Sequence, residues 1–272
     1  PVFACFMGIG VLGCAMLGIP AGWLLFLGIY VIAKVGYQGS LTFYDSMLTD
    51  VTTDDRVDQV SAHGYAWGYI GSCIPFVISI LLILYAEPLG LGSTKAAALV
   101  FAFNAVWWFV LTLPLLRSFE QVCYVEKKEH PVRESFERLF GVMKDVWKNR
   151  QIFWFLAAFF FYIDGVYTII DMATSYGKDV GISDADLMLA LLLMQVVAFP
   201  CSILFGSLAK KLEGGRLIRL SILGYLVIVL FAVQMSHAWE FWLLAVCVAV
   251  FQGGIQALSR SYFTRIIPKE QA

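Results

Sequence analysis

The sequence predicts an all-α integral membrane protein made of two helical bundles. Of its 272 residues, 60% are hydrophobic and 14% are charged, against about 45–50% and about 25% in soluble domains. The apolar residues form long unbroken runs, which is typical of membrane-spanning helices rather than of barrel strands. A soluble protein of this size cannot bury so much apolar surface, so the composition excludes a soluble enzyme and a disordered chain. The net charge of −1 gives no sign of a nucleic-acid partner.

Each predicted span is an apolar run close to the length of about 20 residues that crosses a bilayer. Eight runs qualify: 2–19, 22–47, 62–86, 95–117, 151–173, 185–209, 217–235 and 239–258. Only Pro20 and Ala21 separate the first two runs, and only three residues separate the last two. Links this short make the two helices of each pair antiparallel.

Lysine and arginine divide the polar segments between the spans into two alternating sets. Sixteen of these residues lie in or beside segments 48–61, 118–150, 210–216 and 259–272, whereas the other set has only Lys95 and Lys178. Because cytoplasmic loops carry an excess of Lys and Arg, we expect the first set to be cytoplasmic.

The longest polar segment has a helical pattern of its own. Its apolar residues recur at Val132, Phe136, Leu139, Phe140, Met143, Val146 and Trp147. This spacing predicts an amphipathic helix at the inner membrane face, over 131–150. The alternative is a solvated linker in which the periodicity is incidental.

An internal repeat predicts the architecture. Segment 37–40 (YQGS) and segment 251–254 (FQGG) both lie near the cytoplasmic end of an inward-running span, 214 residues apart. Matched segments of the same orientation, six spans apart, indicate two parallel halves. The predicted division is a first bundle at 1–117, a linker at 118–150 and a second bundle at 151–272. A complete molecule would have six spans in each half, so we expect this chain to be a fragment with eight of twelve spans.

Several stretches resemble a known family. The loop 206–216 (GSLAKKLEGGR) is similar to a conserved loop of the major facilitator superfamily, although Lys210 replaces its acidic residue. Four further stretches resemble the vacuole-effluxer-like branch of that superfamily: 43–48 (FYDSML), 60–69 (VSAHGYAWGY), 161–166 (FYIDGV) and 252–261 (QGGIQALSRS). The resemblance implies the two-bundle fold with spans three to ten present. It also implies transport of a small solute, with amino acids as the class exported by fungal members.

Polar side chains at membrane depth are the candidate substrate and ion-coupling residues, because such groups need a cavity or a partner. They fall on three spans: Lys34 and Gln38; Asp164, Tyr167, Thr168 and Asp171; and Gln252 and Gln256. The resemblance places these spans around a central cavity. For Asp171 the alternative is a headgroup position, and for the two glutamines it is bonding between helices.

Lys34 and Asp164 each lie near the middle of a span, one in each half. We expect Asp164 to be a proton-coupling carboxylate and Lys34 its alternating partner, because a nearby ammonium lowers the pKa of a carboxylate and desolvation raises it. The alternative is a permanent ion pair that cancels two buried charges.

Two predicted cytoplasmic segments carry opposite charge at equivalent positions of the repeat. The first holds Asp50, Asp54, Asp55 and Asp58, and the second holds Arg260, Arg265 and Lys269. We expect ion pairs between them to close the cytoplasmic side, with Asp45, Arg260 and Arg265 as gating residues. The alternatives are two independent solvated loops and, for Asp45, a water-exposed helix end.

No motif for a catalytic site, a nucleotide, a metal or another cofactor occurs, so none of these is expected. The predicted function is secondary active transport of a small solute, coupled to protons or to the solute gradient, by alternating access. A non-transporting scaffold or receptor and a membrane-embedded enzyme are the alternatives. The predicted surroundings are the lipid bilayer of a bacterial inner membrane, with the complete protein monomeric.

Overall fold

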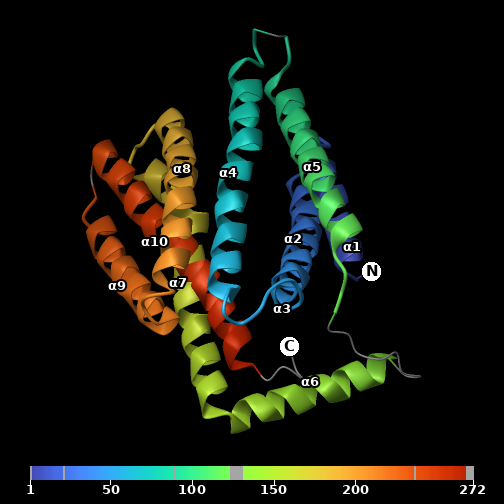
Figure 1. The fold of residues 1–272 in the computed structure, drawn as a ribbon. Coiled ribbons are helices and arrows are strands. Elements are labelled where there is room, and N and C mark those ends of the chain that lie inside the picture. The colour runs from blue at the N-terminus through green and yellow to red at the C-terminus, as the bar shows by residue number, and fades with distance from the viewer. Residues whose placement is uncertain (1, 21, 89, 123–130, 236, 268–272) are drawn as a thin grey trace. The chain divides into compact units, whose positions relative to one another are not determined.

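The computed structural model describes residues 2–20, 22–88, 90–122, 131–235 and 237–267. In these ranges all regular structure is helical, and Figure 1 labels the elements. They are α1 (Val2–Met16), α2 (Trp23–Ser46), α3 (Leu48–Val51), α4 (Val57–Leu84), α5 (Ser93–Ser118), α6 (Pro131–Lys148), α7 (Arg150–Asp179), α8 (Asp184–Leu208), α9 (Gly214–Ala232) and α10 (Ala238–Ile266).

Each of the eight predicted spans corresponds to a helix. Among the described residues, seven helices are long and apolar enough to cross a membrane. The remaining predicted span, 2–19, is α1, which has only 15 residues. It ends at Met16, four residues before Pro20, whose ring is incompatible with the interior of a helix.

Several helices continue past the apolar runs that predicted them. α4 begins five residues before 62, α7 ends six residues after 173, and α10 ends eight residues after 258. Hydropathy identifies only the part of a helix that faces lipid, whereas backbone hydrogen bonds continue until a cap or a breaker intervenes. At the start of α7, for example, the Asn149 side chain accepts from the backbone N–H groups of Gln151 and Ile152.

The chain divides into two compact units. Unit 1 comprises Pro1–Asp50 and Gly71–Val122, with α1, α2, the second half of α4 and α5. In this unit α1 packs closely on α2 because Gly36 has no Cβ, and a Cβ at this position would collide with the Gly10 backbone.

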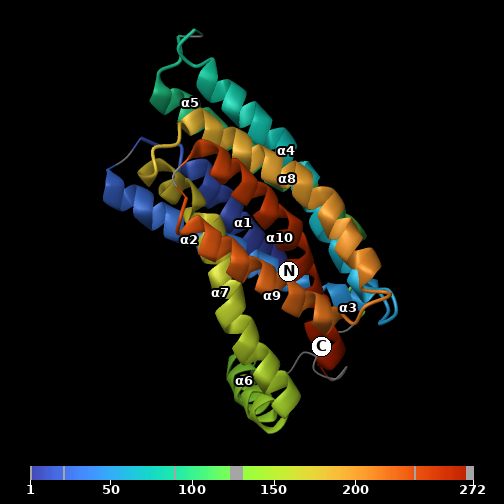
Figure 2. The same ribbon diagram turned by 90° about the vertical axis from the view of Figure 1, so that its left-hand side faces the viewer.

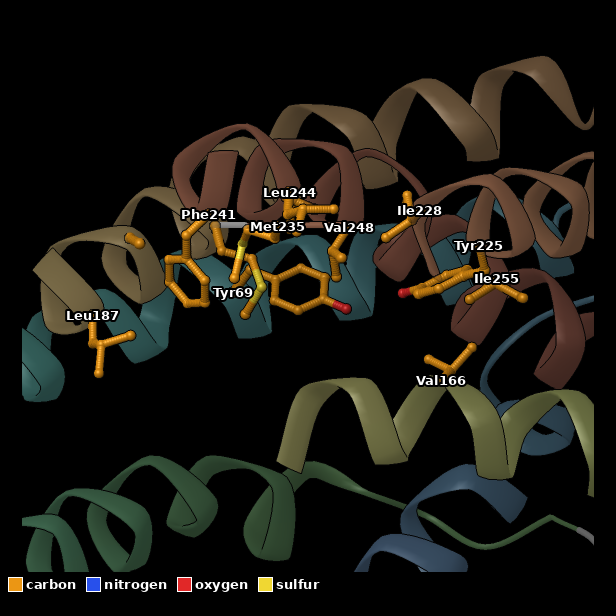
Figure 3. Packing of buried hydrophobic residues seen from close by; sticks show 14 of the residues in the cluster. Tyr69, Val166, Leu187, Tyr225, Ile228, Met235, Phe241, Leu244, Val248 and Ile255 are labelled. Atoms are coloured by element: carbon orange, nitrogen blue, oxygen red, sulfur yellow. The ribbon is translucent and has the colours of Figure 1, made fainter. Parts of the chain in front are cut away.

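Unit 2 comprises Val51–Ile70 and Cys123–Ala272, so it includes the first half of α4 together with α6 to α10. Residues 51–70 precede the linker in sequence, but they pack with the helices that follow it. The predicted bundle division at 117 and 151 stays a prediction. The core of unit 2 is built from α4, α7, α8, α9 and α10, and Figure 3 shows Tyr69, Tyr225 and Val248 within it.

The predicted amphipathic helix is present as α6. Its residues Leu139, Phe140, Met143 and Trp147 leave between 49% and 68% of their surface exposed. A single residue, Asn149, joins α6 to α7, and the Trp147 ring lies 5.0 Å from that of Phe153. Figure 2 shows α6 at the end of α7, with the axis of α6 turned away from the axis of α7. The position of α6 at the membrane face stays a prediction.

Candidate functional site

The first half of α4 lies directly against α8 and α10 in unit 2. Small residues permit this contact: Ala62 is fully buried, and a Cβ at Gly206 of α8 would lie only 2.5 Å from the Ala62 Cβ. Two serines then bond across the interface. Ser202 Oγ donates to the Ala62 carbonyl at 3.0 Å, and Ser61 Oγ donates to the Ala257 carbonyl of α10 at 2.8 Å.

Arginine side chains of α10 hold the start of α4 at its predicted cytoplasmic end. Arg260 Nε donates to Ser61 Oγ at 3.0 Å, and its guanidinium carbon lies 5.1 Å from the centre of the Tyr65 ring. Ser61 therefore accepts from Arg260 while it donates to α10. A guanidinium within about 6 Å of an aromatic ring is attracted to its face.

Five residues further along α10, Arg265 binds the acidic segment, which holds Asp50, Asp54, Asp55 and Asp58. Its Nη2 lies 2.8 Å from Asp58 Oδ2 and donates to the Asp54 carbonyl at 3.1 Å. The Asp58 side chain is only 8% exposed, so this ion pair is better shielded from water than a surface pair. We call the bonds of Arg260 and Arg265 to α4 and the preceding loop the α4–α10 clamp.

The acidic segment does not act as one block. Asp55 is fully exposed and accepts a hydrogen bond from the Thr53 hydroxyl, which holds the pKa of the Asp55 carboxyl below its usual value. Asp54 meets Arg265 through its main chain. Asp58 contributes its side chain, which forms the ion pair with Arg265 of α10.

A polar cluster lies deeper in unit 2, between α4, α9 and α10. Tyr69 donates to Gln256 Oε1 at 2.8 Å, and the Gln252 side chain also hydrogen-bonds the Tyr69 hydroxyl. Figure 3 shows the hydroxyl of Tyr225 directed toward that of Tyr69. Tyr69, Gln252 and Tyr225 are each at most 8% exposed. We call these four residues the tyrosine–glutamine cluster.

Three further predicted site residues belong to α2 in unit 1. Lys34 and Gln38 are exposed on α2 in unit 1, and the Lys34 ammonium lies 6.0 Å from the centre of the Tyr37 ring. Asp45 is half-buried at the last turn of α2. Because Lys34 belongs to unit 1 and Asp164 to unit 2, their pairing stays a prediction.

The four candidates of α7 are all exposed side chains: Asp164, Tyr167, Thr168 and Asp171. Thr168 lies at the edge of a pocket of about 320 Å³ between α7, α8, α9 and α10. Its other lining residues include Met172, Met194, Leu244 and Val248, so the pocket is apolar. It offers few hydrogen-bonding groups to a polar solute.

Sequence reasoning overlooked the contribution of α4. Ser61, Tyr65 and Tyr69 recur at intervals of four residues and therefore share one helix face. This polar stripe was a usable signal, but aromatic residues are common near membrane interfaces and so carry little weight singly. In the described ranges no group of three or more His, Cys, Asp or Glu side chains has the arrangement of a metal site.

Known proteins match nearly the whole chain. The family model described as "Vacuole effluxer Atg22 like" matches residues 49–272. The MFS-type transporter YxiO of Bacillus subtilis is 45% identical over 99% of this chain and 64% of its own length. Autophagy-related protein 22-1 of Penicillium rubens is 27% identical over 77% of the chain and 39% of its own length. Autophagy-related protein 22 of Saccharomyces cerevisiae is 24% identical over 79% and 47%.

These matches confirm the resemblance and the fold class inferred from the sequence. The chain is an all-α integral membrane protein of the major facilitator type. Its relatives are named as transporters or effluxer-family members rather than as enzymes. The chain spans less than two thirds of the length of the relatives it matches.

Proposed function

Because the chain belongs to the vacuole effluxer Atg22-like family, we propose that the protein is a secondary active transporter of a small solute that works by alternating access. The proposed solutes are amino acids, and the proposed direction of transport is efflux. A proton gradient or the gradient of the solute itself is the proposed energy source. The proposed location is a bacterial inner membrane. Family membership and the apolar helices support the general part of this proposal, which is a membrane transporter.

The observation that carries the mechanism is the α4–α10 clamp. In chain order α4 belongs to the first four spans and α10 to the last four, so bonds between them tie the two halves of the sequence together. Alternating access requires contacts that hold one side closed and yet break at low cost. Hydrogen bonds and partly exposed ion pairs satisfy this requirement, because each contributes only about 0–1.5 kcal/mol net.

The deeper contacts of the same interface support a sliding or rocking motion. The hydroxyls of Ser61 and Ser202 donate to backbone carbonyls across α4, α8 and α10, and the small Ala62 lies fully buried between them. Close helix contacts of small residues have little side-chain bulk to displace when helices separate. Opening then exposes the tyrosine–glutamine cluster, and closing buries it.

Coupling is the second part of the proposal. Asp164 would exchange a proton with the solution while the helices move, and Lys34 would approach it in one state and leave it in the other. The exposure of Asp164 on α7 is compatible with proton exchange.

Flux through the purified complete protein in liposomes tests the proposal. Liposomes loaded with single radiolabelled L-amino acids should release at least one of them faster than protein-free liposomes, and an imposed pH gradient should change the rate. A protein that binds lipid and folds but moves no amino acid with or without a gradient would favour the scaffold alternative.

A further inference from the structure

Two buried acceptor atoms in the tyrosine–glutamine cluster have no partner in the part of the chain that the structure describes. They are Gln252 Oε1 and Tyr225 Oη. Both residues are 6% exposed, so bulk water does not solvate them in this conformation. A buried polar atom without a hydrogen bond destabilises a fold, and native structures contain few of them.

The hydrogen bonds of the cluster explain why these atoms are left over. Tyr69 has one hydroxyl hydrogen, which it gives to Gln256 Oε1 at 2.8 Å. The bond between Gln252 and the Tyr69 hydroxyl therefore uses a hydrogen of the Gln252 amide. The hydrogen bonds are thus donated from Gln252 to Tyr69 and from Tyr69 to Gln256. The Gln252 side-chain oxygen remains as an acceptor without a donor.

The described groups closest to the free acceptor are uncharged, and the nearest cation on this face of α4 is Arg260, 5.1 Å from the Tyr65 ring. The groups that act on the Tyr69 hydroxyl are Tyr65, Tyr167, Tyr225 and Gln252. Around them lie apolar side chains such as Val166 and Ile255, which Figure 3 shows beside Tyr225. A cation buried here would lack a carboxylate to balance it, whereas an uncharged N–H or O–H donor would match the acceptor at no such cost.

We infer that Gln252 and Tyr225 form a specificity subsite for an uncharged hydrogen-bond donor, such as the hydroxyl or amide group of the transported solute. The inference rests on the proposed transport function and adds a preference to it. A site with buried groups left unpaired by the wrong solute discriminates more strongly than an apolar pocket does. Gln252 Oε1 accepts from the solute, and the Tyr225 hydroxyl donates to it or accepts from it.

The first test needs no solute. Tyr225→Phe removes an unpartnered hydroxyl, so the melting temperature of the purified protein should stay the same or rise. Tyr162→Phe is the matched control, because the Tyr162 hydroxyl lies 2.7 Å from Ser259 Oγ and its loss should lower the melting temperature. If Tyr225→Phe lowers the melting temperature as Tyr162→Phe does, the hydroxyl already has a structural partner, such as a buried water, and the subsite is wrong.

The second test uses L-threonine and L-valine, which have nearly the same shape and differ in that a hydroxyl of threonine replaces a methyl group of valine. The wild-type protein should bind and release threonine at least about tenfold better, the value of one good hydrogen bond. Tyr225→Phe and Gln252→Met should each reduce that preference to about twofold or less. Equal handling of the two amino acids by the wild type, or a preference that survives both substitutions, would overturn the inference.

The two tests separate this inference from the proposed function. A wild-type protein that moves amino acids without regard to the hydroxyl contradicts the subsite and leaves transport standing. A protein that moves no solute contradicts transport, and the melting temperatures of Tyr225→Phe and Tyr162→Phe still decide whether the Tyr225 hydroxyl lacks a partner.

Discussion

Reversing the charge of Arg265 should open the cytoplasmic end of the α4–α10 interface. In the wild type its guanidinium lies 2.8 Å from Asp58 Oδ2. Arg265→Glu replaces this attraction with the repulsion of two carboxylates in a partly shielded place. Two unit charges at this distance interact by about 1.5 kcal/mol in water and about 6 kcal/mol at an effective dielectric constant of 20.

The true cost lies near the lower end of that range. The Arg265 side chain is 35% exposed, and the Glu and Asp carboxylates, which sit on shorter side chains than Arg, can turn apart into water. We expect about 1–3 kcal/mol, which changes the ratio of closed to open molecules by about 5-fold to 150-fold. The double variant Asp58→Arg/Arg265→Glu restores opposite charges and should return most of the closed population.

The assay is labelling of one introduced cysteine by a membrane-impermeant maleimide. Ala66→Cys is suitable because Ala66 is fully buried in the closed interface, one turn beyond Ala62. In a background without the six native cysteines, Arg265→Glu should increase the labelling rate and the charge swap should reverse it. Lys211→Glu, an equal charge change at an exposed residue after α8, should leave it unchanged. Equal labelling in the wild type and Arg265→Glu would refute the reasoning.

Three more outcomes are expected. Gly206→Leu places a side chain in the α4–α8 contact and should destabilise the protein by about 1–3 kcal/mol, seen as a lower melting temperature; an unchanged value would contradict that packing. Asp164→Asn should abolish pH-driven transport but spare solute exchange, whereas loss of folding and its rescue by Lys34→Met would indicate a structural pair. Thr53→Val should raise the pKa of Asp55 toward its ordinary value. The Asp55 carboxylate then adds less stability above its unfolded pKa, and acidification removes that stability at a higher pH than in the wild type. An NMR titration in which the Asp55 pKa does not change would contradict the Thr53 contact.

Sequence patterns predicted most of the helices because a segment that crosses lipid must be a long and mostly apolar helix. Long apolar runs located the spans, and the amphipathic period located α6. The true ends of α4, α7 and α10 were not predictable from hydropathy, since these helices continue beyond their apolar runs through polar residues. Caps such as Asn149 decide such ends, and their geometry is visible only in the structure.

The candidate site was predictable in charge but not in geometry. Opposite charges pointed to contacts between the acidic segment and Arg265, and the structure contains the Arg265–Asp58 pair, whose gating role stays a prediction. The bond from Tyr69 to Gln256 joins residues 187 positions apart. No periodicity reveals such a pairing, because it depends on how α4 packs on α10.

Locking the clamp tests the account most directly. Asp58→Cys and Arg265→Cys, in a background without the native cysteines, place one thiol on each side of the wild-type ion pair. A short bifunctional methanethiosulfonate should join them and stop amino-acid flux in liposomes, and a reductant that cleaves the link should restore it. The same reagent should not lower the flux of either single cysteine variant. Full flux through protein shown by mass spectrometry to be cross-linked would contradict the claim that transport requires α4 and α10 to separate.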